Sequence, residues 1–121
     1  MTFFNMALLD LDIISELRMI LEDDIHAVAT QFAEQLHEQL TALQLAQAAE
    51  DFDQIKRVAH LLKGSAANLG ATDLATAAAT LERAAQHTDM TQITPLLFTL
   101  PELAQTTLMA LRDLGINTTS M

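Results

Sequence analysis

Apolar side chains recur at steps of three and four residues along much of the chain, which is the spacing of one face of an α-helix. Between residues 24 and 48 these positions are Ile25, Val28, Phe32, Leu36, Leu40 and Leu43. A shorter stretch, Leu11 to Leu21, follows the same pattern with Ile13 or Ile14, Leu17, Ile20 and Leu21. Asp10 directly precedes it and suits the N-cap position. We therefore expect a short helix over residues 11–21 and a long helix over residues 24–48.

A third helix is expected after Asp51. The residues from Asp51 to Gln54 resemble a capping box, in which polar side chains satisfy the free N–H groups of the first helical turn. The helix should continue to Leu69, and Gly70 suits the left-handed position just beyond a helix end.

Two further helices are expected over residues 72–86 and 90–114. Pro95 and Pro101 lie in the second of these segments, so the helix either bends at a proline or breaks and starts again. Gly115 ends it, and we expect residues 116–121 to fray.

Four long helices with short connections pack most simply as an antiparallel up-down-up-down four-helix bundle. The short helix over residues 11–21 would then cover one end of the bundle. Aromatic residues make up only 4% of the chain, which favours helices over strands. No linker, low-complexity tract or internal repeat divides the sequence. The expected fold is all-α, with residues 1–121 as a single domain.

The net charge of −10 argues against two classes of binding partner. A strongly acidic domain repels nucleic acid and anionic membranes, so neither is an expected partner. The chain has no Cys, which excludes disulfides, thiol catalysis and Cys-based zinc sites. The N-terminus lacks the basic region of a signal peptide, and no apolar stretch approaches the length of a membrane span. We expect a cytoplasmic protein.

The helix that follows Asp51 has an apolar side and a polar side, and His60 lies on the polar side. On a helical wheel, the residues within roughly 60° of His60 are Lys56, Arg57, Lys63, Gly64 and Ala67. The residues on the opposite side are Ile55, Val58, Leu62, Ala66 and Leu69. The apolar side faces the core, so His60 should face solvent.

The face around His60 suits an anion. Three of the six basic residues of the chain lie there, and Lys63 is one turn beyond His60. Gly64 in mid-helix costs about 1 kcal/mol relative to Ala, and close approach of another protein is a reason to accept that cost. Neutral imidazole is a good nucleophile toward phosphorus. The face has no carboxylate pair or phosphate-binding loop, so a phosphoryl carrier here would depend on a partner for its catalytic groups and magnesium.

The segment from His60 to Ala71, HLLKGSAANLGA, resembles the signature of the histidine phosphotransfer (HPt) family, H-x-L-K-G-S-x-x-x-L/I-G. The resemblance continues after this signature, because Leu74, Leu81 and Glu82 match the pattern of the helix that follows it in the family. The resemblance covers about residues 8–113, almost the whole chain. Leu61 is a mild departure, because many members carry Thr or Ser there.

The resemblance implies a four-helix bundle in which His60 is the phosphoacceptor. It implies that Lys63 is the cation beside the phosphoryl group and that Gly64 gives access to the partner. Glu82 occupies a position from which some members reach the histidine ring with a Gln or another polar side chain. The resemblance also implies that the chain is a phosphocarrier and not itself an enzyme, and that it has no cofactor of its own.

The expected partners are receiver domains of response regulators, a hybrid sensor histidine kinase, or both. We expect them to dock on the exposed side of the third helix, at Lys56, Arg57 and Ala67, together with the adjacent face of the second helix. We expect the chain to be a monomer.

Two alternatives remain open. The first is an HPt-like module that binds a kinase or receiver without transferring a phosphoryl group. The second is a metal- or haem-binding bundle, suggested by the six Met residues and by the E-x-x-H pattern from Glu34 to His37. A di-iron bundle needs two such motifs and the chain has one, so we expect no metal site.

Overall fold

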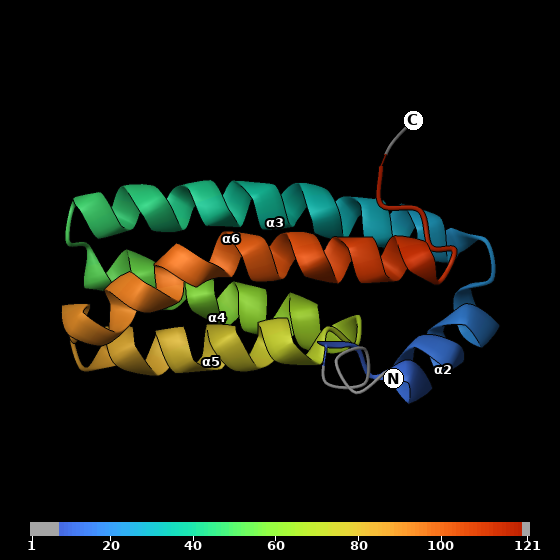
Figure 1. The fold of residues 1–121 in the computed structure, drawn as a ribbon, viewed down its shortest axis with the longest axis horizontal. Coiled ribbons are helices and arrows are strands. Elements are labelled where there is room, and N and C mark those ends of the chain that lie inside the picture. Colours follow the sequence, from blue (N-terminus) through green and yellow to red (C-terminus); the bar gives the residue numbers. More distant parts are fainter. Residues whose placement is uncertain (1–7, 120–121) are drawn as a thin grey trace.

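The computed structural model describes residues 8–119. Within this range the chain forms five α-helices and no strand (Figure 1). The helices are α2 (Leu11–Leu21), α3 (Asp24–Ala48), α4 (Phe52–Asn68), α5 (Thr72–Gln86) and α6 (Met90–Asp113). These bounds confirm the helices expected from the apolar pattern to within one residue at each end.

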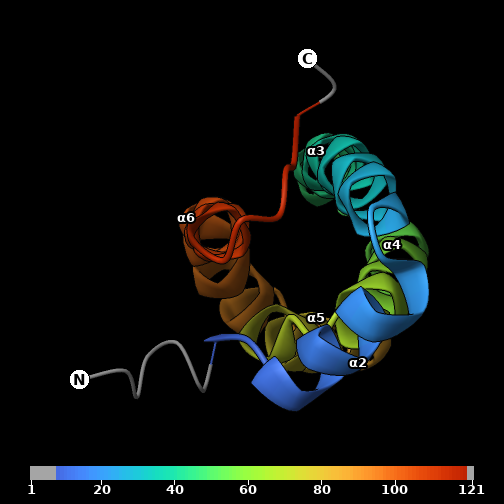
Figure 2. The ribbon, with the colours of Figure 1, turned by 90° about the vertical axis from the view of Figure 1, so that its right-hand side faces the viewer.

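Helices α3 to α6 form an antiparallel four-helix bundle, because each short connection reverses the direction of the chain (Figure 1). Seen along the bundle, they follow one another around the core in chain order, and α2 lies across one end (Figure 2). Helices α4 and α5 pack against each other most extensively, whereas α3 and α6 make fewer contacts. The predicted all-α bundle with an additional short N-terminal helix is confirmed.

Aspartate side chains begin three of the helices. The carboxylate of Asp10 accepts hydrogen bonds from Asp12 N and Ile13 N at 3.1 and 3.3 Å. Asp51 accepts one from Gln54 N at 3.1 Å, as expected from the capping pattern. Asp89 does the same at the start of α6. Each cap satisfies an N–H group that has no partner within its helix, a contribution of about 1 kcal/mol.

Helix α6 runs through both prolines without a break. Pro95 and Pro101 lie inside a single helix of 24 residues, so of the two expected outcomes the structure shows the continuous one. The first part of α6 is bent relative to the rest (Figure 1). A bend is the physical consequence of each proline, which lacks the N–H that would bond to the preceding turn.

The core consists mainly of Leu, Ile and Ala side chains from all five helices. Two positions that follow the core pattern are nevertheless on the surface. Ile20 of α2 is 75% exposed and Val28 of α3 is 40% exposed, so their assignment to the core side was wrong. No helix within residues 8–119 is both long enough and apolar enough to cross a membrane.

The expectation of a frayed C-terminal tail was wrong for residues 116–119, and residues 120 and 121 lie outside the described part of the chain. The chain crosses from the end of α6 to α3 (Figure 2), and the side chains of Ile116 and Thr118 are buried. His26 Nδ1 accepts a hydrogen bond from Asn117 N at 3.0 Å, which ties the tail to α3. The segment therefore closes the bundle between its first and last long helices.

We expect Ile116→Ala to lower the free energy of unfolding by about 2–4 kcal/mol, because it removes a fully buried side chain and leaves a cavity. Chemical denaturation measures this change. Leu45→Ala, at an exposed position of α3, is the matched control and should change stability by less than about 0.5 kcal/mol. Equal, small losses in the two variants would show that the tail contributes nothing to the fold.

Candidate functional site

His60 lies in the middle of α4 with its side chain in solvent. Ile55 and Leu62, on the opposite side of the same helix, are completely buried and fix the rotation of α4 against the core. The side chain of His60 is 64% exposed as a result. The structure thus places His60 where the helical wheel predicted it.

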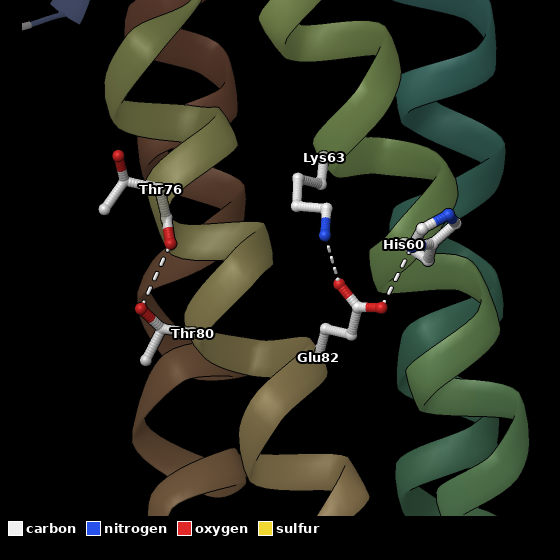
Figure 3. A network of polar contacts seen from close by, with 5 residues as sticks. All are labelled: His60, Lys63, Thr76, Thr80 and Glu82. Carbon is white, nitrogen blue, oxygen red and sulfur yellow. Dashed lines mark hydrogen bonds and ion pairs between the residues drawn. The ribbon is translucent and has the colours of Figure 1, made fainter.

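A single carboxylate connects His60 to Lys63 (Figure 3). Glu82 comes from α5, the helix that packs most extensively on α4. Its Oε2 lies 2.9 Å from His60 Nδ1, and its Oε1 lies 2.8 Å from Lys63 Nζ. The Glu82 side chain is only 19% exposed. One partly buried edge of the site is therefore an acidic bridge between two helices, with the histidine and the lysine on either side.

The contact with Glu82 sets the state of the imidazole ring. A carboxylate can only accept, so with neutral His60 the proton is on Nδ1, which donates to Glu82 Oε2. Nε2 then carries the free lone pair. The ring directs this second nitrogen away from Glu82 (Figure 3), and Nε2 has no hydrogen-bond partner among residues 8–119. The arrangement presents a nucleophilic nitrogen to solvent.

Glu82 is held in its ionised form. The Lys63 ammonium, which donates a hydrogen bond to Oε1, is the main reason that the pKa of Glu82 lies below its ordinary value. The hydrogen bond from His60 lowers the pKa further, while partial burial opposes both. At neutral pH the carboxylate is therefore available as an acceptor for the ring.

Gly64 leaves open space beside His60. A Cβ atom built on Gly64 meets no atom within 4 Å beyond its own stretch of α4 among residues 8–119, so no packing contact in this part of the chain requires a glycine there. Ala67, one turn further along α4, is also exposed and small. The surface next to the histidine is therefore low and accessible, as the sequence predicted.

Lys56 and Arg57 lie on the other side of His60. Both are exposed, and together with His60 they line a shallow hollow of about 460 Å³ that also includes Asp53, Leu61 and Glu82. Arg57 also donates a hydrogen bond to the side chain of Gln54. The basic side chains of this face thus flank His60 on two sides. Lys63, expected beside the phosphoryl group, lies toward one end of α4, and Lys56 and Arg57, expected to dock the partner, lie toward the other.

Sequence reasoning did not find two features of the site. The first is that Lys63 is paired with Glu82, because the bridge depends on how α5 packs on α4. The second is a difference between the two borders that separate the apolar side of α4 from its polar side. At one border Ala59 is fully buried, and at the other Leu61 is 57% exposed. The closeness of α5, whose Ala-rich sequence allows tight packing, explains why the Ala59 side is covered.

The residues considered for metal binding do not come together in the described part of the chain. Residues 8–119 contain no group of three or more His, Cys, Asp or Glu side chains arranged to hold a metal ion. His37 is exposed on α3, and His26 is engaged with the backbone of Asn117.

Comparison with protein families identifies the family of the fold. The model of the Hpt domain family matches residues 27–113, well over half of the chain. The chain belongs to the Hpt domain family. The predicted resemblance is thereby confirmed, and the matched range contains α4 with His60, Lys63 and Gly64 as well as Glu82 of α5.

A solved structure shows the same Hpt fold. It is histidine-containing phosphotransfer protein B (HptB) from Pseudomonas aeruginosa PAO1, with a TM-score of 0.84 and 24% sequence identity. The alignment covers 88% of this chain and 92% of that chain. A sequence comparison with curated proteins gives no match. Membership of the Hpt family supports a phosphotransfer role in a phosphorelay. The expected role as a phosphocarrier fits this membership.

Proposed function

We propose that His60 accepts a phosphoryl group from the aspartyl phosphate of one receiver domain and passes it to another receiver domain. The observation that supports this most directly is the state of the ring. Nδ1 is occupied by Glu82, while Nε2 is exposed and free. This is the arrangement that a phosphoryl carrier needs, because the reacting nitrogen must enter the active site of a second protein.

The transfer step needs no proton to leave the histidine. The lone pair of Nε2 forms a bond to phosphorus, while the bond from phosphorus to the aspartate oxygen breaks and that carboxylate leaves with the electron pair. The ring becomes positively charged and keeps its proton on Nδ1. Glu82, 2.9 Å from Nδ1, stabilises that charge. The reverse sequence of events returns the phosphoryl group to a second aspartate.

Lys63 supports the phosphorylated state in this proposal. An ammonium group has three donors, so Lys63 can keep its bond to Glu82 and donate another to a phosphoryl oxygen. The side chain is 38% exposed and belongs to the turn that follows His60. The proposal assigns the magnesium site and the remaining catalytic groups to the receiver or kinase, since phosphoryl transfer relies on positioning and charge stabilisation.

Proteins of this family interact with receiver domains and kinases, and we propose that this chain does so through the His60 face of α4. Gly64 and Ala67 provide a low surface, and Lys56 and Arg57 attract an acidic partner. Our prediction for the partners stays receiver domains, a hybrid sensor histidine kinase, or both. The single domain over residues 1–121, the monomeric state and the cytoplasmic location also stay predictions.

Transfer of label from a phosphorylated receiver domain tests the proposal. The wild-type chain should become labelled, and the label should be stable in alkali and lost in acid, as expected of phosphohistidine. His60→Gln should take up no label. His37→Gln, which removes an exposed histidine from α3, is the matched control and should behave as the wild type.

Two outcomes would contradict the proposal. Full labelling of His60→Gln would show that another residue is the acceptor. Failure of a folded wild-type chain to take label from each of several receivers that bind it would favour a module that binds its partners without transferring a phosphoryl group.

A further inference from the structure

A groove of about 300 Å³ lies between α3 and α6, on the side of the bundle away from His60. The four long helices follow one another around the core in chain order, so the seam between α3 and α6 is opposite the seam between α4 and α5 (Figure 2). The bridge between His60 and Glu82 spans α4 and α5. The groove is therefore separate from the surface that carries the phosphoryl group.

Hydrogen bonds join α3 and α6 at both ends of this seam. At one end, Gln47 Nε2 of α3 donates to Thr94 Oγ1 of α6 at 3.4 Å. At the other end, the tail that follows α6 crosses to α3 (Figure 2), where Thr30 Oγ1 donates to Asn117 O at 3.4 Å. The groove lies between these two connections and thus has a defined beginning and end.

The floor and walls of the groove are mainly apolar. Leu36 and Ala104 are buried at the floor, and the partly buried Leu40 and Leu108 supply the walls. The α6 residues that line the groove lie between positions 101 and 112, which is about 16 Å of helix. A hollow of this length matches about three turns of a helix that lays its apolar face into it.

Two large apolar side chains of α6 project into solvent beside the groove. Phe98 is 84% exposed and Met109 is 51% exposed. On the helix, both lie within roughly 40° of Gln105, which lines the groove. Apolar side chains in solvent at the edge of an apolar groove indicate a surface that another molecule covers.

The α3 edge of the groove is acidic. Glu34 and Glu38 line a shallow hollow that shares Ala33 and His37 with the groove. Both carboxylates are exposed, and neither forms an ion pair with another residue in the range 8–119. The chain carries a net charge of −10, and three of its six basic residues lie on the His60 face. The surface away from that face therefore attracts a basic partner.

We propose that the groove between α3 and α6 binds a basic amphipathic helix of a second protein. The apolar face of this helix lies in the groove beside Phe98, and its lysines or arginines lie over Glu34 and Glu38. Arg112 lines the end of the groove nearest the tail, so the helix places no basic residue there. Because the groove is opposite His60, the second protein and a receiver domain bind at the same time. The inference goes beyond phosphoryl transfer and does not depend on it.

A synthetic amphipathic helix of about 15 residues, with leucines on one face and lysines on the other, is the probe. In a nitrogen-15 NMR titration of the wild-type chain, it should shift the amide signals around Leu40 and Leu108 and leave those around His60 unchanged. A peptide with glutamates in place of the lysines should bind at least about tenfold more weakly. Saturating lysine peptide should leave the binding of a receiver domain unchanged.

Phe98→Lys tests the apolar edge of the groove. It should raise the dissociation constant of the lysine peptide at least about tenfold, because it replaces an apolar contact by a like charge. Leu45→Lys is the matched control, since Leu45 is 69% exposed on α3 and lies roughly 140° from Leu40 on the helix. This control adds the same charge away from the groove and should bind the peptide as the wild type does.

A pair of double variants tests the acidic edge. Glu34→Gln with Glu38→Gln should raise the dissociation constant of the lysine peptide about fivefold. Asp12→Asn with Glu16→Gln removes the same charge from exposed positions of α2 and should change the constant less than about twofold at physiological salt.

Three results would overturn the inference. They are amide shifts centred on His60, loss of receiver binding when the peptide is added, and equal dissociation constants for the wild type and Phe98→Lys. Equal binding of the lysine and glutamate peptides would overturn the basic character assigned to the partner. Self-association of the wild type in sedimentation, abolished by Phe98→Lys, would instead assign the groove to a second copy of this chain.

Discussion

Replacing Gly64 by Leu should slow phosphoryl transfer from a receiver domain by about a hundredfold, because the reacting atoms must approach to within bonding distance and small displacements are costly. Gly64 is exposed on the His60 face, and a Cβ there meets no neighbouring atom within 4 Å in the part of the chain that the structure describes. The added side chain would occupy space that belongs to the partner. Stopped-flow or rapid-quench measurement of labelled phosphoryl transfer gives the rate constant.

Gly64→Ala separates access from folding. Alanine is the better helix former, so this variant should be more stable than the wild type by about 1 kcal/mol in chemical denaturation. It should nevertheless transfer phosphoryl groups no faster than the wild type. Gly64→Leu should also fold without loss of stability. If Gly64→Leu transferred at the wild-type rate, the glycine would have no role in partner access.

Replacing Glu82 by Ala should also lower the transfer rate constant by about a hundredfold. Without the carboxylate, nothing fixes the proton on Nδ1 or the orientation of the ring, and the charge that develops on the imidazole loses its partner 2.9 Å away. Glu82→Gln should show a smaller loss, since its amide oxygen still accepts the hydrogen bond from Nδ1–H but carries no charge. The same rapid-quench assay compares the three proteins.

Nitrogen-15 NMR of the His60 ring distinguishes this positioning role from a structural one. The wild type and Glu82→Gln should show the tautomer with hydrogen on Nδ1, and Glu82→Ala should populate the tautomer with hydrogen on Nε2. An unchanged tautomer in Glu82→Ala, with an unchanged rate, would contradict the role assigned to Glu82.

Stability should depend on Glu82 in a pH-sensitive way. The pKa of Glu82 is lower in the folded protein than its ordinary value, chiefly because of Lys63, so the folded state favours the ionised carboxylate. The stabilisation that ionised Glu82 gives the fold is therefore complete above the ordinary pKa of a glutamate. It is lost as the pH falls through the lowered pKa of Glu82 in the folded protein. The stability difference between the wild type and Glu82→Gln should shrink on going from pH 7 to about pH 3.

The sequence was sufficient to predict features that depend on local periodicity. The opposite faces of α4 follow from residue spacing alone, because Ile55 and Leu62 cannot face the core unless His60 faces solvent. The caps at Asp10 and Asp51 follow from residue type and position. The HPt signature, with its fixed spacing of His60, Lys63 and Gly64, is specific enough to indicate the family by itself.

Features that depend on packing between helices were not predictable in this way. Glu82 is 22 residues from His60 in sequence, and the resemblance to the family, not periodicity, suggested that it reaches the ring. Its pairing with Lys63 depends on the packing of α5 on α4 and was not predicted. Periodicity likewise assigns Ile20 and Val28 to the core, although the bundle leaves them exposed. Periodicity also contains no signal for the tail, in which Ile116 is buried and Asn117 N is hydrogen-bonded to His26 of α3.

The most direct test of the account is to locate the phosphoryl group on the wild-type chain after transfer from a phosphorylated receiver. Phosphorus–nitrogen couplings in NMR, together with mass spectrometry under alkaline conditions, identify both the residue and the ring atom. The account predicts phosphorylation of His60 at Nε2, with Nδ1 still protonated and bonded to Glu82. A phosphoryl group on Nδ1 of His60, or on His26, His37 or His87, would contradict it.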